Sequence, residues 1–180
     1  PTGVSAQAAS PTGLLYAAAT LRQLARLSSA QGGLECMTIV DYPEFRMRGI
    51  YIEGGQERFG RIVDKEYLLE QIRRLAEFKM NTLVIECYNL LPFASFPACA
   101  DKGTLSMEDC REIVAESKRF HVTLVPSLQT LAQAYELVWT CAEGEPYREA
   151  TAPGMMCPSN PDIYPLIEGL YRDLLVWFDD

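Results

Sequence analysis

The stretch FKMNTLVIECYNLLPFASFP, Phe78 to Pro97, decides the fold class of this chain. Its first half holds a run of apolar or β-branched residues, Thr82 to Cys87, that is interrupted only by Glu86. A nearly continuous apolar run is typical of a strand covered on both faces, as in a parallel sheet flanked by helices. We therefore predict a central strand here. Side chains at its carboxyl end, Glu86 to Asn89, are expected to project into the mouth where ligands bind in open sheets and barrels.

Two further short apolar runs lie on either side of this stretch in the sequence. RGIYIE, Arg48 to Glu53, ends in a carboxylate, and HVTLVPSLQT, His121 to Thr130, carries its proline near the end, where a missing backbone donor does least harm. The three predicted strands are centred on Ile50, Leu83 and Leu124. Their spacing of roughly 35 to 40 residues is that of barrel units.

Helical patterns and capping signals separate these strands. A helix is predicted from Pro11 to about Leu27, a second follows a cap at Asp64, and Ser106 with Asp109 forms a capping box for a third. Asn160-Pro161 is expected to begin the last helix, and the segment before Val40 has strand character. Strands alternating with helices predict an α/β fold with a parallel sheet.

Length, composition and charge narrow the class of protein. The chain has 180 residues, of which 48% are hydrophobic and 22% charged, and this suits one domain or slightly more. The net charge is −8 and no run of Lys or Arg forms a stripe, so nucleic acid is not an expected partner. No stretch approaches the roughly 20 apolar residues of a membrane span, so no membrane partner is expected either. The start, PTGVSAQAAS, lacks the features of a signal peptide and is interpreted as the cut edge of a longer chain.

The six cysteines and the single histidine argue against a metal or cofactor. The cysteines form no CxxC pair, and free thiols in a reducing compartment are favoured over a disulfide framework, which weakly favours a cytoplasmic location. His121 lies between a predicted helix and a predicted strand, where a structural role is expected. One histidine with scattered cysteines gives neither a zinc site nor a Ser-His-Asp triad.

Several segments, in order along the chain, resemble the β-N-acetylhexosaminidase family, glycoside hydrolase family 20. The matching segments are a linking helix, the run into the first barrel strand, the second helix and strand, the third strand with its loop, and the helix before the fourth strand. They read SPTGLLYAAATLRQL (10–24), DYPEFRMRGIYIE (41–53), LAEFKMNTLVI (75–85), VPSLQTLAQ (125–133) and CPSNPDIYPLIEGLYRDLL (157–175).

The resemblance implies part of a (β/α)8 TIM barrel, its first three β/α units, preceded by a linking helix. Residues 1–44 would end a small N-terminal α+β domain, and residues 45–180 would be the first part of the catalytic barrel. Such enzymes are glycosidases that cleave terminal N-acetylhexosamine residues by substrate-assisted retaining hydrolysis, with the acetamido group of the substrate as nucleophile. The implied partners are an N-acetylhexosamine-containing glycan and the remainder of the barrel, or another chain that completes the sheet.

The Asp-Glu pair that does the chemistry in this family follows its fourth strand, beyond the last residue here. Asp179 and Asp180 are interpreted as the polar end of a helix, so no catalytic residue is assigned and residues 1–180 alone are predicted to be inactive. A non-catalytic carbohydrate-binding or scaffolding relative with a TIM-barrel-like domain is the alternative. A self-contained open α/β domain is a third.

The candidate substrate-binding residues follow the first three strands. They are Glu53, Gln56, Arg58, Glu86, Tyr88, Asn89, Gln129 and Gln133. Several depart from the family pattern. Glu53 and Gln56 stand where the family has Asp and Arg, with Arg58 displaced; Tyr88 and Asn89 stand where acidic residues are common; and Ala132-Gln133 replaces Gly-His.

Simpler interpretations stand beside these. Glu86 could instead pair with a lysine or arginine of a covering helix, and Arg58 could be a solvated loop cation. Tyr135 and Trp139 could stack on a sugar, but packing of their helix against the sheet is favoured.

Overall fold

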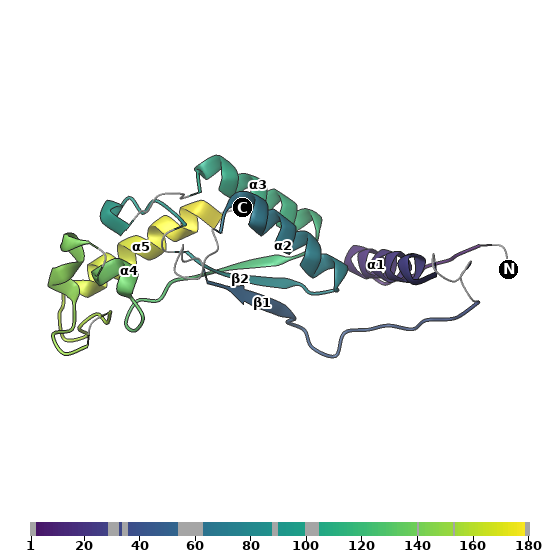
Figure 1. Ribbon diagram of the computed structural model, residues 1–180, viewed down its shortest axis with the longest axis horizontal. Coiled ribbons are helices and arrows are strands. Elements are labelled where there is room, and N and C mark those ends of the chain that lie inside the picture. The colour runs from purple at the N-terminus through teal and green to yellow at the C-terminus, as the bar shows by residue number, and fades with distance from the viewer. Residues whose placement is uncertain are drawn as a thin grey trace.

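The structure, a computed structural model, describes residues 3–28, 33, 36–53, 63–87, 90–99, 105–139, 141–152 and 154–178. Its centre is a three-stranded parallel sheet of β1 (Gly49–Ile52), β2 (Thr82–Glu86) and β3 (Thr123–Ser127), in the order β1-β2-β3 (Figure 1). Ile50 pairs with Leu83, and Leu83 pairs with Leu124. The prediction of a central strand between two parallel neighbours is confirmed.

Four helices and several shorter turns surround the sheet in the described part of the chain. Figure 1 shows α2 and α3 side by side on one face of the sheet, with α1 and α4 at opposite ends of the molecule. The elements are α1 (Pro11–Ser28), α2 (Lys65–Glu77), α3 (Met107–Arg119) and α5 (Ile163–Phe178), with the single turn α4 (Tyr135–Val138) and the 3-10 turns η2 (Pro97–Cys99) and η3 (Ala142–Tyr147).

The predicted N-caps of α2 and α3 are both formed. Asp64 accepts a hydrogen bond from the backbone N–H of Tyr67 at 2.8 Å, which satisfies a donor in the first turn of α2. Ser106 and Asp109 form the complete capping box of α3. Hydrogen bonds from Ser106, and then the ion pair with Lys65, lower the pKa of Asp109 to about 2.

The two faces of the sheet differ in what covers them. Because side chains alternate along a strand and paired residues share a face, one side carries apolar residues that meet α2 and α3. These are buried and include Ile52, Leu83, Ile85, Cys87 and Leu128. We call the opposite side the open face, since no described helix covers it (Figure 1). It carries Tyr51, Val84, Glu86, Val125 and Ser127.

Gly49 allows β1 to lie close against β2. A Cβ at this position would lie 2.1 Å from the carbonyl oxygen of Thr82 and 2.7 Å from its Cβ. Backbone that approaches so closely leaves room only for hydrogen at Cα. Gly49, the first residue of β1, therefore has a structural explanation.

The guanidinium of Arg48 joins α1 to the start of the sheet. It donates two hydrogen bonds to the carbonyl oxygen of Lys79, at 3.0 and 2.8 Å, and one to the hydroxyl of Tyr16 at 2.9 Å. It also lies 5.6 Å from the centre of the Tyr16 ring. Gln23 adds a hydrogen bond to the carbonyl oxygen of Glu77 at 2.9 Å. Together these contacts tie α1 to the turn between α2 and β2.

One expectation for local structure is corrected: residues 36–40 form no strand, because no described segment offers them a backbone partner. Asn160 caps the last helix as predicted, because its Oδ1 accepts from the N–H of Asp162 at 3.0 Å. The first turn is wound more tightly, with hydrogen bonds from Ile163 to Asn160 and from Tyr164 to Pro161, so the α-helix itself begins at Ile163. Leu166, Leu170 and Leu174 of this helix are buried, as its pattern predicts.

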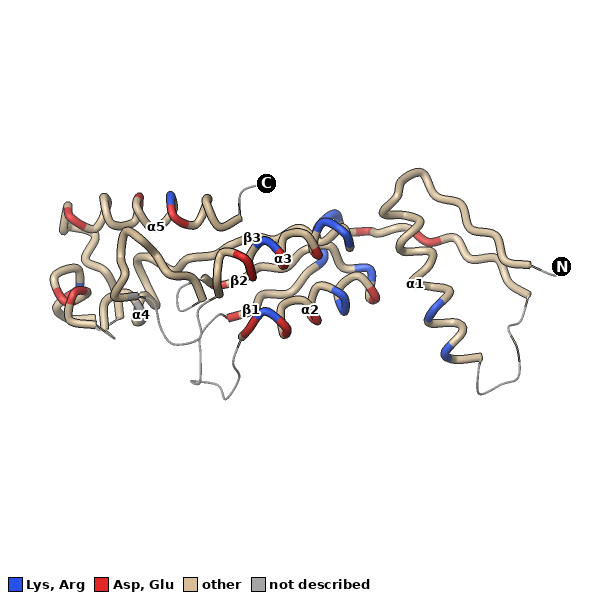
Figure 2. The backbone as a smooth tube through the Cα atoms, turned by 90° about the horizontal axis from the view of Figure 1, so that it is seen from above, with Lys and Arg blue, Asp and Glu red and all other residues tan. Residues whose placement is uncertain are grey.

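The charged residues and the free cysteines are distributed as in ordinary globular proteins. Figure 2 shows Lys and Arg interspersed with Asp and Glu along α2 and α3. No helix among the described residues has the length and apolar character needed to cross a bilayer. Of the cysteines that the structure describes as free, Cys87 and Cys110 are buried, Cys36 is exposed, and Cys141 and Cys157 are intermediate.

Candidate functional site

Three polar side chains, from β1, from β2 and from the loop that follows β3, meet on the open face. The hydroxyl of Tyr51 donates a hydrogen bond to Oε2 of Glu86 at 2.7 Å. Nε2 of Gln129 donates to Oε1 of Glu86 at 2.8 Å, and lies 3.5 Å from the hydroxyl of Tyr51. We call Tyr51, Glu86 and Gln129 the open-face cluster.

Strand register brings this cluster together. Tyr51 is the backbone partner of Val84, and Glu86 lies two residues further along β2, on the same face. Glu86 is in turn the partner of Ser127, and Gln129 lies two residues beyond that, again on the same face. The three side chains therefore converge at the carboxyl ends of the strands, the edge where parallel sheets bind ligands.

Glu86 is the centre of the cluster and is fully buried, at 0% exposure. Each of its carboxylate oxygens accepts a hydrogen bond from a neutral donor, one from a phenol and one from an amide. The alternative in which Glu86 pairs with a lysine or arginine of a covering helix is wrong, because its side chain lies on the face opposite α2 and α3. A buried carboxyl group needs such partners, since leaving it without hydrogen bonds is costly.

The hydrogen-bonding pattern fixes the orientation of each group. The single proton of the Tyr51 hydroxyl is given to Glu86, so its oxygen can only accept from Gln129. A carboxylate accepts but does not donate, so the amide of Gln129 must present Nε2 to Glu86. Oε1 of Gln129 is consequently the amide atom that the cluster leaves for another donor.

Burial, followed by the hydrogen bond with Glu86, raises the pKa of Tyr51 to about 12. The residue as a whole is 50% exposed, and its hydroxyl lies against Glu86. The carboxylates of Glu86 and Glu53 raise the pKa further, because a phenolate beside them would be repelled. Tyr51 is therefore a neutral donor at physiological pH.

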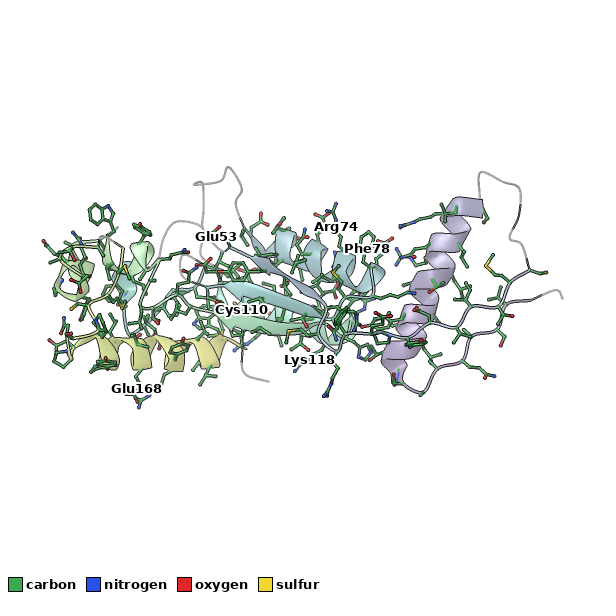
Figure 3. All side chains as sticks on the ribbon, turned by 90° about the horizontal axis from the view of Figure 1, so that it is seen from below. Glu53, Arg74, Phe78, Cys110, Lys118 and Glu168 are labelled. Atoms are coloured by element: carbon green, nitrogen blue, oxygen red, sulfur yellow. The ribbon has the colours of Figure 1, made fainter. Side chains whose placement is uncertain are left out.

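The other candidate residues are not members of this cluster, and several lie outside the described residues. Glu53 is exposed and follows β1, at the carboxyl end of that strand (Figure 3). Gln133 is exposed and has a left-handed backbone, with a φ of 55°. The remaining candidates lie outside the described residues, as do the two final aspartates: Gln56, Arg58, Tyr88, Asn89, Asp179 and Asp180.

Tyr51 is the residue that sequence reasoning missed. It precedes Glu53 by two residues on the predicted strand, so alternation alone places both side chains on one face. That signal was available from the sequence. Its contact with Glu86 was not, because the contact depends on the register between β1 and β2.

The cluster offers polar groups suited to a neutral, hydroxyl-rich ligand. Gln129 supplies an acceptor, as does Glu53 beside the cluster, and the half-exposed Tyr51 supplies an aromatic surface. The described residues contain no group of three or more His, Cys, Asp or Glu placed to hold a metal ion. The chemistry that this arrangement supports is binding and orientation.

A separate hollow of about 580 Å³ lies at the other end of the strands. Asn81, Val122 and Thr123, at the amino ends of β2 and β3, line it together with Lys118, His121 and Phe178. His121 sits just beyond α3 with a φ of 54° and an exposed side chain, so it closes the turn between helix and strand. This hollow shares no residue with the open-face cluster.

Comparison with known proteins gives a consistent result. No family model matches the chain. It is 24% identical to the beta-hexosaminidase subunit A1 of Dictyostelium discoideum over 161 residues, which cover 81% of this chain and 29% of that protein. Among solved structures, a β-N-acetylhexosaminidase from Bacteroides fragilis superposes with a TM-score of 0.73 at 18% identity, covering 96% of this chain and 38% of that one.

A GH20 exo-β-N-acetylglucosaminidase from Vibrio harveyi, solved with N-acetylglucosamine, superposes with a TM-score of 0.72 at 18% identity. The match covers 95% of this chain and 32% of that one. The chain thus spans about a third of the length of these relatives. At this level of identity the likeness shows the fold.

Proposed function

From the fold that the chain shares with the corresponding part of the β-N-acetylhexosaminidases, we propose that it contributes to a site for terminal N-acetylhexosamine residues. The resemblance of its sequence implies the same fold. The three strand-and-helix units would form the opening part of a TIM barrel. Residues 45–180 would belong to that barrel, and residues 1–44 to the end of the preceding domain. The remaining strands, or another chain, would complete the sheet.

The observation that supports this proposal is the open-face cluster. Its members come from two adjacent strands, β1 and β2, and from the loop that follows the third, and they meet at the carboxyl edge, where barrel enzymes bind their substrates. Glu86 is buried, so it would act as a positioning residue that holds Tyr51 and Gln129 in one arrangement. Preorganised polar groups of this kind lower the cost of ordering a site when the ligand binds.

Each residue of the site would have a distinct part in binding. Oε1 of Gln129 and the carboxylate of Glu53 would accept hydrogen bonds from sugar hydroxyls or from the acetamido N–H. The exposed ring of Tyr51 would lie against the apolar C–H groups of the sugar. Gln56, Arg58, Tyr88, Asn89 and Gln133 remain candidates for the same site.

In the proposed reaction the acetamido group of the substrate attacks its own anomeric carbon, and a protein acid protonates the leaving oxygen. A general acid typically contributes roughly a hundred- to ten-thousand-fold in rate. Both oxygens of Glu86 are already engaged by donors, so the cluster would bind and orient the sugar rather than supply that acid. Residues 1–180 alone are expected to bind sugar without cleaving it.

The alternative is a carbohydrate-binding or scaffolding relative without catalysis. The burial of Glu86 favours it, because both oxygens of this carboxyl group already accept hydrogen bonds within the cluster. The two proposals share the ligand and differ in turnover. A general acid in the rest of the barrel would favour the hydrolase, and its absence would favour the binding protein.

Two measurements on the full-length protein test these proposals. The first is hydrolysis of an aryl N-acetylglucosaminide, and the second is calorimetric binding of N-acetylglucosamine. Gln129→Leu and Glu53→Gln are each expected to weaken binding about two- to tenfold, the equivalent of one hydrogen bond. Glu168→Gln, a change of the same type on the exposed surface of α5, is the matched control and should have no effect.

The outcomes separate the two functions. Turnover by the wild type supports the hydrolase, and binding without turnover supports the alternative. If wild-type protein neither binds nor cleaves these compounds, or if the variants bind as the wild type does, the proposed site is wrong.

A further inference from the structure

Two extended segments, residues 3–8 before α1 and residues 36–43 after it, have backbones that pair with nothing in the described part of the chain. Neither segment makes a backbone hydrogen bond to a residue that the structure describes. In Figures 1 and 2 both run from the end of the molecule marked N toward the sheet, so they point in the same direction. Extended backbone with unpaired donors and acceptors is a template for another strand.

The second segment exposes apolar side chains along its length. Met37 and Ile39 are 52% and 49% exposed, whereas Val40 is 84% and Tyr42 75% exposed. Met37 and Ile39 lie two residues apart, as do side chains on one face of a strand, and they are the less exposed of the four. Residues 36–40 carry no charge, and three of them are β-branched, which is the composition of a strand. Neighbouring apolar side chains in solvent mark an interaction surface.

The helix between the two segments is incompletely covered. Of the 18 residues of α1 only Ala19 is buried. Tyr16 and Gln23 lie on the side of the helix that contacts the base of the sheet, whereas Leu21 and Leu24, on another side, are only partly buried. Helices in proteins are stabilised mainly by packing of an apolar face against a neighbouring layer. α1 therefore has apolar surface that a further layer would bury.

The order of these three elements is that of a βαβ unit. In such a unit two parallel strands belong to one sheet, and the helix that joins them covers a face of that sheet. Residues 3–8 and 36–43 have the required direction, but among the described residues no bridge joins them. At least one more strand, between them or beside them, is needed to make a sheet. It would cover Met37 and Ile39 together with the partly buried side of α1.

We propose that residues 36–40 and 4–8 are strands of a sheet completed by polypeptide that precedes residue 1, with α1 on one face of that sheet. The inference rests on the proposed assignment of residues 1–44 to a preceding domain and specifies the surface that joins them. The relatives are about three times as long as this chain, so proteins of this kind have polypeptide that can supply a strand. Because residues 3–8 lie at the same end of the molecule as residues 36–43 (Figure 1), a preceding strand is tethered beside the surface at high effective concentration.

Amide hydrogen exchange of the full-length protein, read by mass spectrometry without any sugar present, tests this proposal. The amides of residues 37–40 are expected to exchange about a hundredfold more slowly than in an unstructured peptide, because they pair in a sheet. This protection should stay constant when the protein is diluted about tenfold, since the partner strand belongs to the same polypeptide. Exchange at the rate of an unstructured peptide would overturn the proposal. Protection that falls on dilution would also overturn it, because a second copy would then supply the strand.

Ile39→Asp is expected to speed exchange at residues 4–8 and 37–40 about tenfold, because a carboxylate would have to be buried against α1. Leu131→Asp, at a position that is 47% exposed against 49% for Ile39, is the matched control and should leave these amides as they are. Unchanged exchange in Ile39→Asp, or an equal increase in both variants, contradicts the proposed sheet. The sugar site is tested separately: unprotected residues 37–40 overturn the sheet alone, whereas a protein that binds no N-acetylglucosamine overturns the proposed site alone.

Discussion

The hydroxyl of Tyr51 on β1 donates to the carboxylate of Glu86 on β2 across 2.7 Å, although the backbone partner of Tyr51 is Val84. The tyrosine side chain therefore leans along the strand toward the carboxyl edge. This diagonal contact connects a half-exposed ring to a fully buried carboxyl group.

Tyr51→Phe is expected to lower the free energy of unfolding by about 1 to 3 kcal/mol, because the buried carboxyl group of Glu86 loses a hydrogen bond that water does not replace. Urea unfolding of the full-length protein measures this change. Tyr171→Phe removes a hydroxyl from an exposed position on α5 and should change the stability by less than about 0.5 kcal/mol. Equal losses of stability in the two variants would show that the hydrogen bond from Tyr51 to Glu86 adds no more stability than an exposed hydroxyl does.

The contribution of Tyr51 is also expected to depend on pH. Its pKa is raised from 10.0 to about 12 in the folded protein, so the folded state keeps a proton that the unfolded state releases between these values. The stabilisation is therefore fully present below pH 10 and is lost as the pH rises toward 12. The difference in stability between wild type and Tyr51→Phe should shrink between pH 9 and pH 11.5, and a constant difference would contradict the assignment.

Gly49→Ala should disrupt the pairing of β1 with β2. The added Cβ would lie 2.1 Å from a carbonyl oxygen of the neighbouring strand, which is backbone and cannot turn aside. Overpacking of this kind costs typically 1–3 kcal/mol, and we expect the upper part of that range. Gly3→Ala, at a position with nothing within 4 Å, is the control, and thermal unfolding distinguishes the two.

Cys87 and Cys110 should resist alkylation in the folded protein. Burial raises the pKa of each thiol to about 12, so almost no thiolate is present at pH 8. Iodoacetamide labelling followed by site-resolved mass spectrometry should find the exposed Cys36 modified first, and the buried pair only after denaturant is added. Rapid labelling of either buried thiol in native protein would contradict the packing of β2 against α3.

Much of the sheet could be predicted from the sequence, because its signals are local. The apolar run around Leu83 indicated a central strand, and the caps at Asp64 and Ser106 marked where α2 and α3 begin. The parallel direction of the three strands followed from the alternation of strands and helices. The predicted cap at Asn160 is present as well, since its side chain accepts from the N–H of Asp162 in the first turn of the last helix.

The candidate site was less predictable, because its contacts join residues far apart in the sequence. The partners of Glu86 are 35 and 43 residues away, and only the strand register identifies them as a phenol and an amide. Trp139, which was expected to pack against the sheet, is 52% exposed. It follows a single helical turn, too short for its periodicity to show which side faces solvent. The stacking of Arg148 on its ring could not be inferred from residue spacing.

Arg48 fixes the orientation of α1 relative to the sheet. Its guanidinium donates two hydrogen bonds to the carbonyl oxygen of Lys79 and a third to the hydroxyl of Tyr16. These bonds oppose rotation of α1 relative to the sheet. A fluorophore or fusion partner attached to α1 would consequently report the orientation of the sheet itself. Arg48→Ala would remove these hydrogen bonds, and the orientation of α1 relative to the sheet would then vary.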